Sequence, residues 1–214
     1  MDYIKLLELR EKVYYRIQDV LTKDDFELSI KNYVGIHEAL FTGLLYNNGH
    51  FRKNNLEKDE DILNGESVDY PDYHTIPTFL RFAFIEEKNT DLKKMSRDEI
   101  IRHVALFMAE LWRIHPFDEG NTRATTVYIE KYLKSLGFST DNDIFKNNSE
   151  YVRNALVRAN YSNEKLGIVP DIEPLVTFLS SVVNHTDSIF DNNKLYVQEL
   201  FEKSKIKKRK KYNY

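Results

Sequence analysis

The hydrophobic residues of this chain recur mostly at intervals of three and four, the spacing that places them on one face of an α-helix. The segments 3–21 and 96–114 show this spacing most clearly. The second segment begins with Ser96 and carries Glu99 three residues later, which is the pattern of a helix capping box. Only 7 glycines and 5 prolines interrupt the 214 residues. The pattern therefore predicts an all-α fold built from long helices.

The other helices follow from the same spacing and from the residues that begin and end a helix. We expect a helix capped by Asp24 that runs to about Tyr46, a helix that Gly137 terminates, and a helix capped by Ser149. Because neither a repeat nor a linker is evident, the chain should form a single helical domain over 1–214. The later helices are predicted over 75–87, 121–136, 149–161, 172–184 and 194–208, and polar loops over 47–60 and 138–148.

One short segment has the pattern of a β-hairpin instead. Asn64 and Gly65 lie between short apolar flanks, and a type I′ turn needs a positive φ at both of its central residues. The expected fold class is therefore all-α, with a small β-hairpin flap attached to the helical domain. The predicted flap consists of Ile62, Leu63, Asn64, Gly65, Glu66, Ser67 and Val68.

Composition and charge narrow the classes of function. The chain has no cysteine, which excludes a disulfide-stapled fold, thiolate metal sites and thiol catalysis. Its 31 basic and 34 acidic residues give a net charge of −3, so the overall charge predicts no nucleic-acid partner. A basic run at 203–211 is expected to be a solvated end. The N-terminal residues lack the pattern of a signal peptide, and no stretch is apolar enough for a membrane span, so we expect a cytoplasmic protein.

The nine residues from His115 to Arg123, His-Pro-Phe-Asp-Glu-Gly-Asn-Thr-Arg, combine the residue types of a phosphate-transfer site. They precede a predicted helix, whose N-terminal N–H groups and dipole favour an anion. Gly120 and Asn121 tolerate the backbone turns that such an anion nest needs. Arg123 adds a guanidinium suited to phosphate oxygens, and His115 can take a proton near neutral pH. A carboxylate beside bound phosphates is the usual protein ligand of Mg²⁺.

These nine residues resemble the signature of the Fic/Doc family, His-x-Phe-x-(Asp/Glu)-Gly-Asn-Gly-Arg-x-x-Arg. The resemblance extends more loosely over about 30–161, where it includes Ile36-His37 and Gly49-His50-Phe51-Arg52. It implies a helical Fic-like core, followed here by C-terminal helices over 172–208. The implied activity is transfer of a nucleoside monophosphate, most often AMP from ATP, to a Ser, Thr or Tyr hydroxyl of a target protein.

Carried over by position, the resemblance implies a role for each residue of the motif. His115 would be the general base that deprotonates the target hydroxyl, and Glu119 would hold Mg²⁺. The hairpin over 62–68 would align the target segment by main-chain pairing. The phosphates of ATP, or of another nucleoside triphosphate, would be held by Gly120, Asn121, Thr122 and Arg123.

The chain departs from the signature at two positions. Thr122 stands where the second glycine is expected, and Thr126 replaces the final arginine, which in the family contacts the outer phosphates. Many relatives carry an inhibitory (Ser/Thr)-x-x-x-Glu-(Gly/Asn) helix whose glutamate pairs with that arginine. Here only Glu130 has Ser or Thr four residues earlier, and it lies in the motif helix itself. We expect no Glu–Arg self-inhibition and a weak grip on the outermost phosphate, while inhibition by a separate partner protein stays open.

Two other functions are compatible with the same residues. A Fic-like fold could transfer a phosphate or phosphocholine group, or it could be a catalytically silent module that binds a nucleotide or a partner protein. The intact His115 and Glu119 favour an enzyme. The spacing of the other histidines predicts no shared metal site, and we expect packing, surface or loop positions for His37, His50, His74, His103 and His185.

Overall fold

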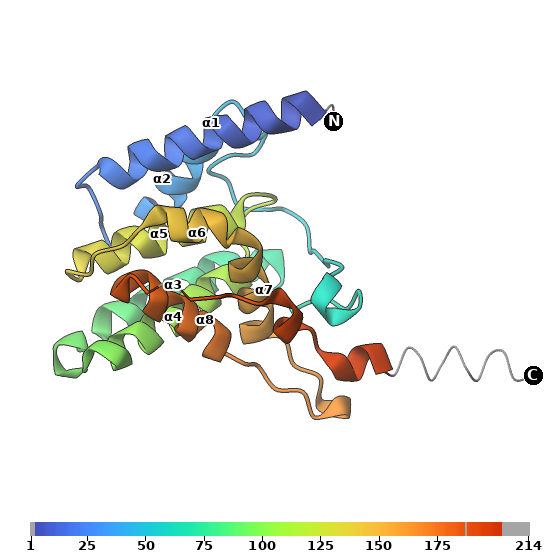
Figure 1. Ribbon diagram of the computed structural model, residues 1–214. Coiled ribbons are helices and arrows are strands. Elements are labelled where there is room, and N and C mark those ends of the chain that lie inside the picture. Colours follow the sequence, from blue (N-terminus) through green and yellow to red (C-terminus); the bar gives the residue numbers. More distant parts are fainter. Residues whose placement is uncertain (1–2, 187, 203–214) are drawn as a thin grey trace, which may run out of the picture.

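Eight α-helices make up most of this computed structural model, which describes residues 3–186 and 188–202 (Figure 1). The helices are α1 (Tyr3–Thr22), α2 (Ile30–Phe41), α3 (Ile76–Asn89), α4 (Arg97–Ile114), α5 (Asn121–Ser135), α6 (Asn142–Asn147), α7 (Ser149–Asn160) and α8 (Glu173–Asn184). Short 3-10 turns lie between them and after α8: η1 (Asp61–Leu63), η2 (Tyr73–Thr75), η3 (Leu92–Lys94), η4 (Glu164–Leu166) and η5 (Asn192–Leu195). The all-α class is therefore confirmed. Within the described ranges, every helix is too short or too polar to span a bilayer.

Helix α4 is the centre of the fold, and it contacts α3, α5, α7 and α8. Its predicted capping box is confirmed: Ser96 accepts from the Glu99 N–H, and the Glu99 carboxylate accepts from the Ser96 N–H at 2.7 Å. The helix is apolar on most sides and therefore lies deep in the core. Its buried residues are Ile101, Val104, Ala105, Phe107, Met108, Ala109, Leu111, Trp112 and Ile114. The motif begins where this helix ends.

Helices α2 and α5 pack against each other, and α1 covers both of them (Figure 1). Tyr33 of α2 joins the two at the centre, because its hydroxyl lies 2.8 Å from Thr125 Oγ1 of α5. The Tyr33 ring also contacts the rings of Phe117 and Tyr128, at centroid distances of 5.6 and 5.3 Å. Since Phe117 belongs to the motif loop and is fully buried, its packing in the aromatic core anchors that loop.

The start of α2 differs from the prediction. The cap is Ser29, whose hydroxyl accepts from the Asn32 N–H at 3.1 Å, and the helix ends at Phe41 instead of near Tyr46. The residues after Asp24 are non-helical because the buried Lys131 ammonium draws this stretch onto α5. That ammonium donates to the carbonyl oxygens of Val20 and Lys23 and to the carboxylate of Asp25, at 2.9, 2.8 and 2.5 Å.

Three later predictions also differ. The predicted loop 138–148 contains α6, because Asp141 caps it and the buried Phe145 anchors it to the core. The cap of α7 is Asn148, and Ser149 is its first helical residue. The helix predicted over 194–208 starts later, because 192–195 form η5 and the helical residues described are 198–202. Leu195, Val197 and Leu200 of this segment are buried. The basic run 203–211 lies outside the described residues.

The predicted β-hairpin is wrong in form, because the described residues contain no strand and only one isolated antiparallel bridge, between Asn163 and Ile168. Asn64 and Gly65 do take positive φ values, 54° and 85°, but they end the 3-10 turn η1. A hairpin strand alternates its faces, whereas the neighbours Ile62 and Leu63 are both buried. We call residues 58–68 the flap loop. It is closed by the hydrogen bonds Lys58 N–Ser67 Oγ and Glu60 N–Glu66 O, at 3.0 and 3.3 Å.

Candidate functional site

His115 ends α4 in the left-handed region, with φ of 46°, and its side chain is buried. Nδ1 lies 3.2 Å from the carbonyl oxygen of Trp112. A carbonyl oxygen can only accept, so the ring proton is on Nδ1 and Nε2 carries a lone pair. Nε2 is buried and has no hydrogen-bond partner among the described residues. The geometry thus presents one unengaged basic nitrogen, as a general base requires.

The surroundings keep this imidazole neutral. Burial, and then the charge of Lys58, lower the pKa of His115 to about 3. The ring of Tyr70 lies edge-on to the imidazole, with a centroid distance of 4.7 Å, and contributes to its burial. The lone pair on Nε2 is therefore available at neutral pH.

Arg52 holds the backbone at the start of the motif. Its Nε donates to the carbonyl oxygen of His115 at 2.8 Å, and its terminal nitrogens donate to those of Asn54 and Pro71 at 2.8 and 2.6 Å. Its own N–H donates to the Pro116 carbonyl at 2.8 Å. The side chain is buried, so these contacts fix the unusual backbone of His115. The sequence resemblance included Arg52 but gave it no role.

Asn121 closes the motif loop on itself. Its Oδ1 accepts from the Phe117 N–H at 3.0 Å, and its Nδ2 donates to the Phe117 carbonyl at 2.7 Å. Because both polar atoms of the Asn121 side chain are engaged, only its main-chain N–H can make the expected contact with phosphate. The first hydrogen bond of α5 runs from Ala124 N to Gly120 O at 3.0 Å, so the N–H groups of Asn121, Thr122 and Arg123 precede the helical ladder.

Gly120 is required at the helix N-cap for two reasons. Its φ is 81°, a value that side-chain-bearing residues rarely adopt. A Cβ at this position would also lie 2.4 Å from Cε2 of Phe41. The Arg123 guanidinium lies over the same Phe41 ring, with 4.9 Å between the guanidinium carbon and the ring centroid. Phe41 therefore contacts both Gly120 and Arg123 and sets their relative positions.

The two carboxylates of the motif have different surroundings. Asp118 accepts from Asn47 Nδ2 at 3.0 Å. The Glu119 side chain is exposed and has no hydrogen bond or ion pair with any described residue. Burial lowers the pKa values of Lys58 and Arg123, and the charge of Glu119 opposes this in both. Glu119 thus lies among the cations of the site with its oxygens available.

A magnesium ion at Glu119 would need oxygens from outside the protein. No group of three or more histidine, aspartate or glutamate side chains gathers within the described ranges to hold a metal. Mg²⁺ typically takes one or two carboxylates, completes its shell with water and substrate phosphates, and so suits this arrangement.

His37 supports the loop from α2. Its Nδ1 accepts from the Gly49 N–H at 3.0 Å, so its Nε2 carries the proton and donates to the Glu119 carbonyl at 2.9 Å. The ring is buried and stacks on Phe117, with 3.7 Å between centroids. Packing was expected from the sequence, but the bond to Glu119 was not, because nothing local links positions 37 and 119.

Thr122 and Thr126, the two departures from the signature, both lie on α5. Thr122 accepts from the indole N–H of Trp112 at 2.9 Å, so one lone pair of its hydroxyl is already engaged. Its Cβ is compatible with the backbone, since Thr122 lies within α5. Thr126 lies one turn after Arg123 on the same helix and brings no charge.

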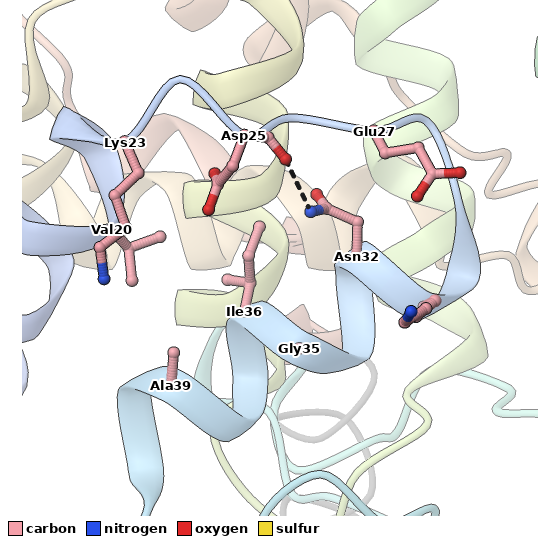
Figure 2. A pocket seen from close by; sticks show the side chains of 9 residues that line it. Val20, Lys23, Asp25, Glu27, Asn32, Gly35, Ile36 and Ala39 are labelled. Carbon is pink, nitrogen blue, oxygen red and sulfur yellow. Dashed lines mark hydrogen bonds between the residues drawn. The ribbon is translucent and has the colours of Figure 1, made fainter.

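A separate hollow of about 310 Å³ lies between the end of α1 and α2 (Figure 2). In α2 it is lined by residues that include Asn32, Gly35 and Ala39, which lie on a different face from His37 and Phe41. Figure 2 shows Lys23, Asp25 and Glu27 on the connecting segment around it. No residue of the motif lines this hollow, so it is not part of the site.

Comparison with known proteins adds independent findings. A family model described as Fic/DOC matches residues 27–133. The structure is similar to that of the BepC protein from Bartonella tribocorum with bound AMPPNP, at 18% identity and a TM-score of 0.66, covering 85% of this chain and 87% of that one. The Fic domain of a VirB-translocated Bep effector protein from Bartonella quintana with bound ADP is 18% identical, has a TM-score of 0.66, and covers 85% of this chain and 86% of that one. A Fic family protein from Desulfovibrio desulfuricans is 17% identical and has a TM-score of 0.59. The match covers 86% of this chain and 54% of that one. No curated protein matches the sequence. At these identities the structural likeness shows a shared fold.

Proposed function

Because the chain belongs to the Fic/DOC family, we propose that it transfers AMP from ATP to a hydroxyl group of a target protein. One observation carries this proposal: the buried, unengaged Nε2 of His115 lies in the same short loop as the anion nest at the start of α5. A nucleotidyl transfer to a hydroxyl needs both a base for the hydroxyl proton and donors for the phosphates.

The reaction can be written with the residues of this chain. The target hydroxyl gives its proton to Nε2 of His115 while its oxygen attacks the α-phosphorus of ATP. A new P–O bond forms to the target, the bond between the α-phosphorus and its bridging oxygen breaks, and pyrophosphate leaves with the electron pair. The N–H groups at the start of α5 and the Arg123 guanidinium stabilise the negative charge on the phosphate oxygens.

Glu119 would hold Mg²⁺ in this reaction, since its carboxylate has no other partner among the described residues and faces the cations of the site. When bound, the ion supplies charge neutralisation at the phosphates. His37 and the Asn121 side chain keep the backbone beside Glu119 in place.

Two similar structures support a nucleotide as the donor. The BepC protein binds AMPPNP and the Bartonella quintana domain binds ADP. AMPPNP is an analogue of ATP, so a triphosphate donor is the simplest choice for this chain as well.

We propose that a target segment pairs with only part of the flap loop. The Ile62 carbonyl accepts from the Val197 N–H at 3.0 Å, so the C-terminal segment already uses one acceptor of this loop. A target segment that pairs with the flap loop would use its other main-chain groups or would displace residues near Val197.

The test is incubation of the full chain with Mg²⁺ and ATP labelled on either the α- or the γ-phosphate, in the presence of cell lysate proteins. We expect protein-bound label from the α-phosphate alone. Label from the γ-phosphate alone would indicate phosphoryl transfer instead, and ATP binding without transfer would indicate a silent module. Either of these results would overturn the proposal.

A further inference from the structure

The core-facing side of α1 ends in an arginine. Val13 and Val20 are buried and Ile17 packs against the core, so positions 13, 17 and 20 form the inner stripe of this helix. Arg10 precedes Val13 by three residues and continues the same stripe by one turn. Its side chain therefore leaves α1 on the side that faces α2 and α5.

α1 is fixed in this position by a second arginine. Arg16 donates to the carbonyl oxygens of Leu40 and Thr42, at 3.1 and 2.8 Å, at the C-terminal end of α2. Between those two residues lies Phe41, whose ring carries the Arg123 guanidinium. Figure 1 shows α1 lying across α2. The inner face of α1 therefore approaches the phosphate nest from the α2 side.

Arg10 continues the side of α1 that packs against α2 and α5, and Arg123 lies at the start of α5 over the Phe41 ring of α2. The charge of Arg10 adds to burial in lowering the pKa of Arg123, and Glu119 opposes both effects. Although neighbouring residues partly cover Arg123, both residues keep surface exposed to solvent, and neither forms a hydrogen bond or ion pair with another side chain that the structure describes. Two guanidinium groups that lie near each other repel unless an anion joins them. A phosphate between them would relieve that repulsion.

We propose that Arg10 of α1, together with Arg123, binds the outermost phosphate of the donor nucleotide and thereby selects a triphosphate. Arg10 takes the place of the charge that Thr126 does not supply on α5. This inference rests on the proposed function, because it assigns the phosphate chain to the nest at the start of α5. It predicts that the contribution of Arg10 grows with the number of phosphates on the ligand.

The experiment measures dissociation constants of the full chain for AMP, ADP and ATP with Mg²⁺, by calorimetry. Arg10→Ala is expected to weaken ATP binding roughly tenfold and to leave AMP binding unchanged, as the loss of a charge-assisted contact to one phosphate predicts. Lys12→Ala is the matched control, because Lys12 is an exposed cation on the opposite side of α1. It should bind all three ligands as the unchanged chain does.

A double-variant cycle sharpens the test. Thr126→Arg should restore ATP binding in the Arg10→Ala background and should add less in the unchanged chain, since both arginines would serve one phosphate. Equal loss of AMP and ATP affinity, or unchanged ATP affinity in Arg10→Ala, would overturn the inference. If Arg10→Ala weakens ATP selectively while no α-phosphate is transferred to protein, the proposed function fails and the assignment of Arg10 stands.

Discussion

His115 combines a strained backbone, a buried ring and a fixed tautomer. A non-glycine residue with φ of 46° costs about 1 kcal/mol or more, and the contacts of Arg52 hold it there. The hydrogen bond to the Trp112 carbonyl fixes the proton on Nδ1. Strain of this kind persists where the surroundings enforce it, and here it aims Nε2 away from its own helix.

The lowered pKa of His115 predicts a flat pH profile. The folded value of about 3 lies far below the ordinary value of 6.5, so the base stays neutral in weak acid. We expect kcat/KM for α-phosphate transfer, which reports the free enzyme, to depend on His115 equally from about pH 8 to about pH 5.5, where an ordinary imidazole would be mostly protonated. Protonation favours the unfolded chain, so the free energy of unfolding should fall as the pH drops from 6.5 toward 3. A roughly tenfold loss of kcat/KM between about pH 8 and 5.5, as an imidazole of ordinary pKa would give, would contradict this assignment.

Gly120 offers a matched pair with Gly137. Both have a positive φ, 81° and 86°, but a Cβ would clash with Phe41 only at Gly120 and would meet nothing at Gly137. Gly137→Ala should cost about 1 kcal/mol of unfolding free energy. Gly120→Ala should cost about 1–3 kcal/mol more, because the Phe41 ring must move. Urea denaturation measures both, and equal costs would show that Phe41 yields freely.

At the scale of elements, the site is the meeting point of three helix ends. α4 ends at His115, α5 begins after Gly120, and α2 ends at Phe41. Arg52 ties the loop after α2 to the first end, and His37 ties α2 to the loop before α5. No single helix makes the site, so its geometry depends on contacts between elements far apart in sequence.

His37 should affect Mg²⁺ binding indirectly, because it positions the backbone of Glu119. His37→Ala removes the donor to the Glu119 carbonyl, which leaves Glu119 less well placed. We expect the Mg²⁺ concentration for half-maximal transfer to rise roughly tenfold, as for the loss of other groups that orient a metal ligand. His50→Ala is the control, because His50 is exposed in the same loop region. If His37→Ala lowers only the melting temperature, its role is packing alone.

Local patterns predicted the elements that local contacts determine. The capping box at Ser96 and Glu99 is complete within four residues, and the start of α4 was predicted correctly. The start of α2 was not, because Lys131 holds Asp25 from 106 positions away. The motif string identified the residues now at the site, but it could not assign Arg52 a role, since the carbonyls that Arg52 binds come together only in the fold.

At the scale of the whole molecule, the C-terminal segment completes the core on the side of the flap loop. Leu195, Val197 and Leu200 are each 3% exposed, and Asn64 Nδ2 donates to the Leu200 carbonyl at 3.2 Å. Within the described ranges, no hydrogen bond or ion pair joins residues 188–202 to residues 115–123. The segment therefore supports the flap loop, and it makes no polar contact with the motif among the described residues.

Truncation before Ser188 should lower stability and should not raise activity. The loss of three buried aliphatic side chains should reduce the unfolding free energy by several kcal/mol, on the order of 2–3 for each. Transfer rates are compared at a temperature where circular dichroism shows both forms folded. A large gain in activity would mean that the segment competes with the target at the flap loop, through groups such as the Ile62 carbonyl.

The most direct test of His115 as the general base is α-phosphate transfer by His115→Ala, measured beside its affinity for ATP. We expect transfer to fall on the order of 10²-fold or more, while the dissociation constant for ATP and the far-ultraviolet circular dichroism stay unchanged. This separation is expected because Nε2 of His115 takes the proton, whereas the nest at the start of α5 holds the phosphates. Full transfer activity in His115→Ala would show that another group takes the proton of the target hydroxyl.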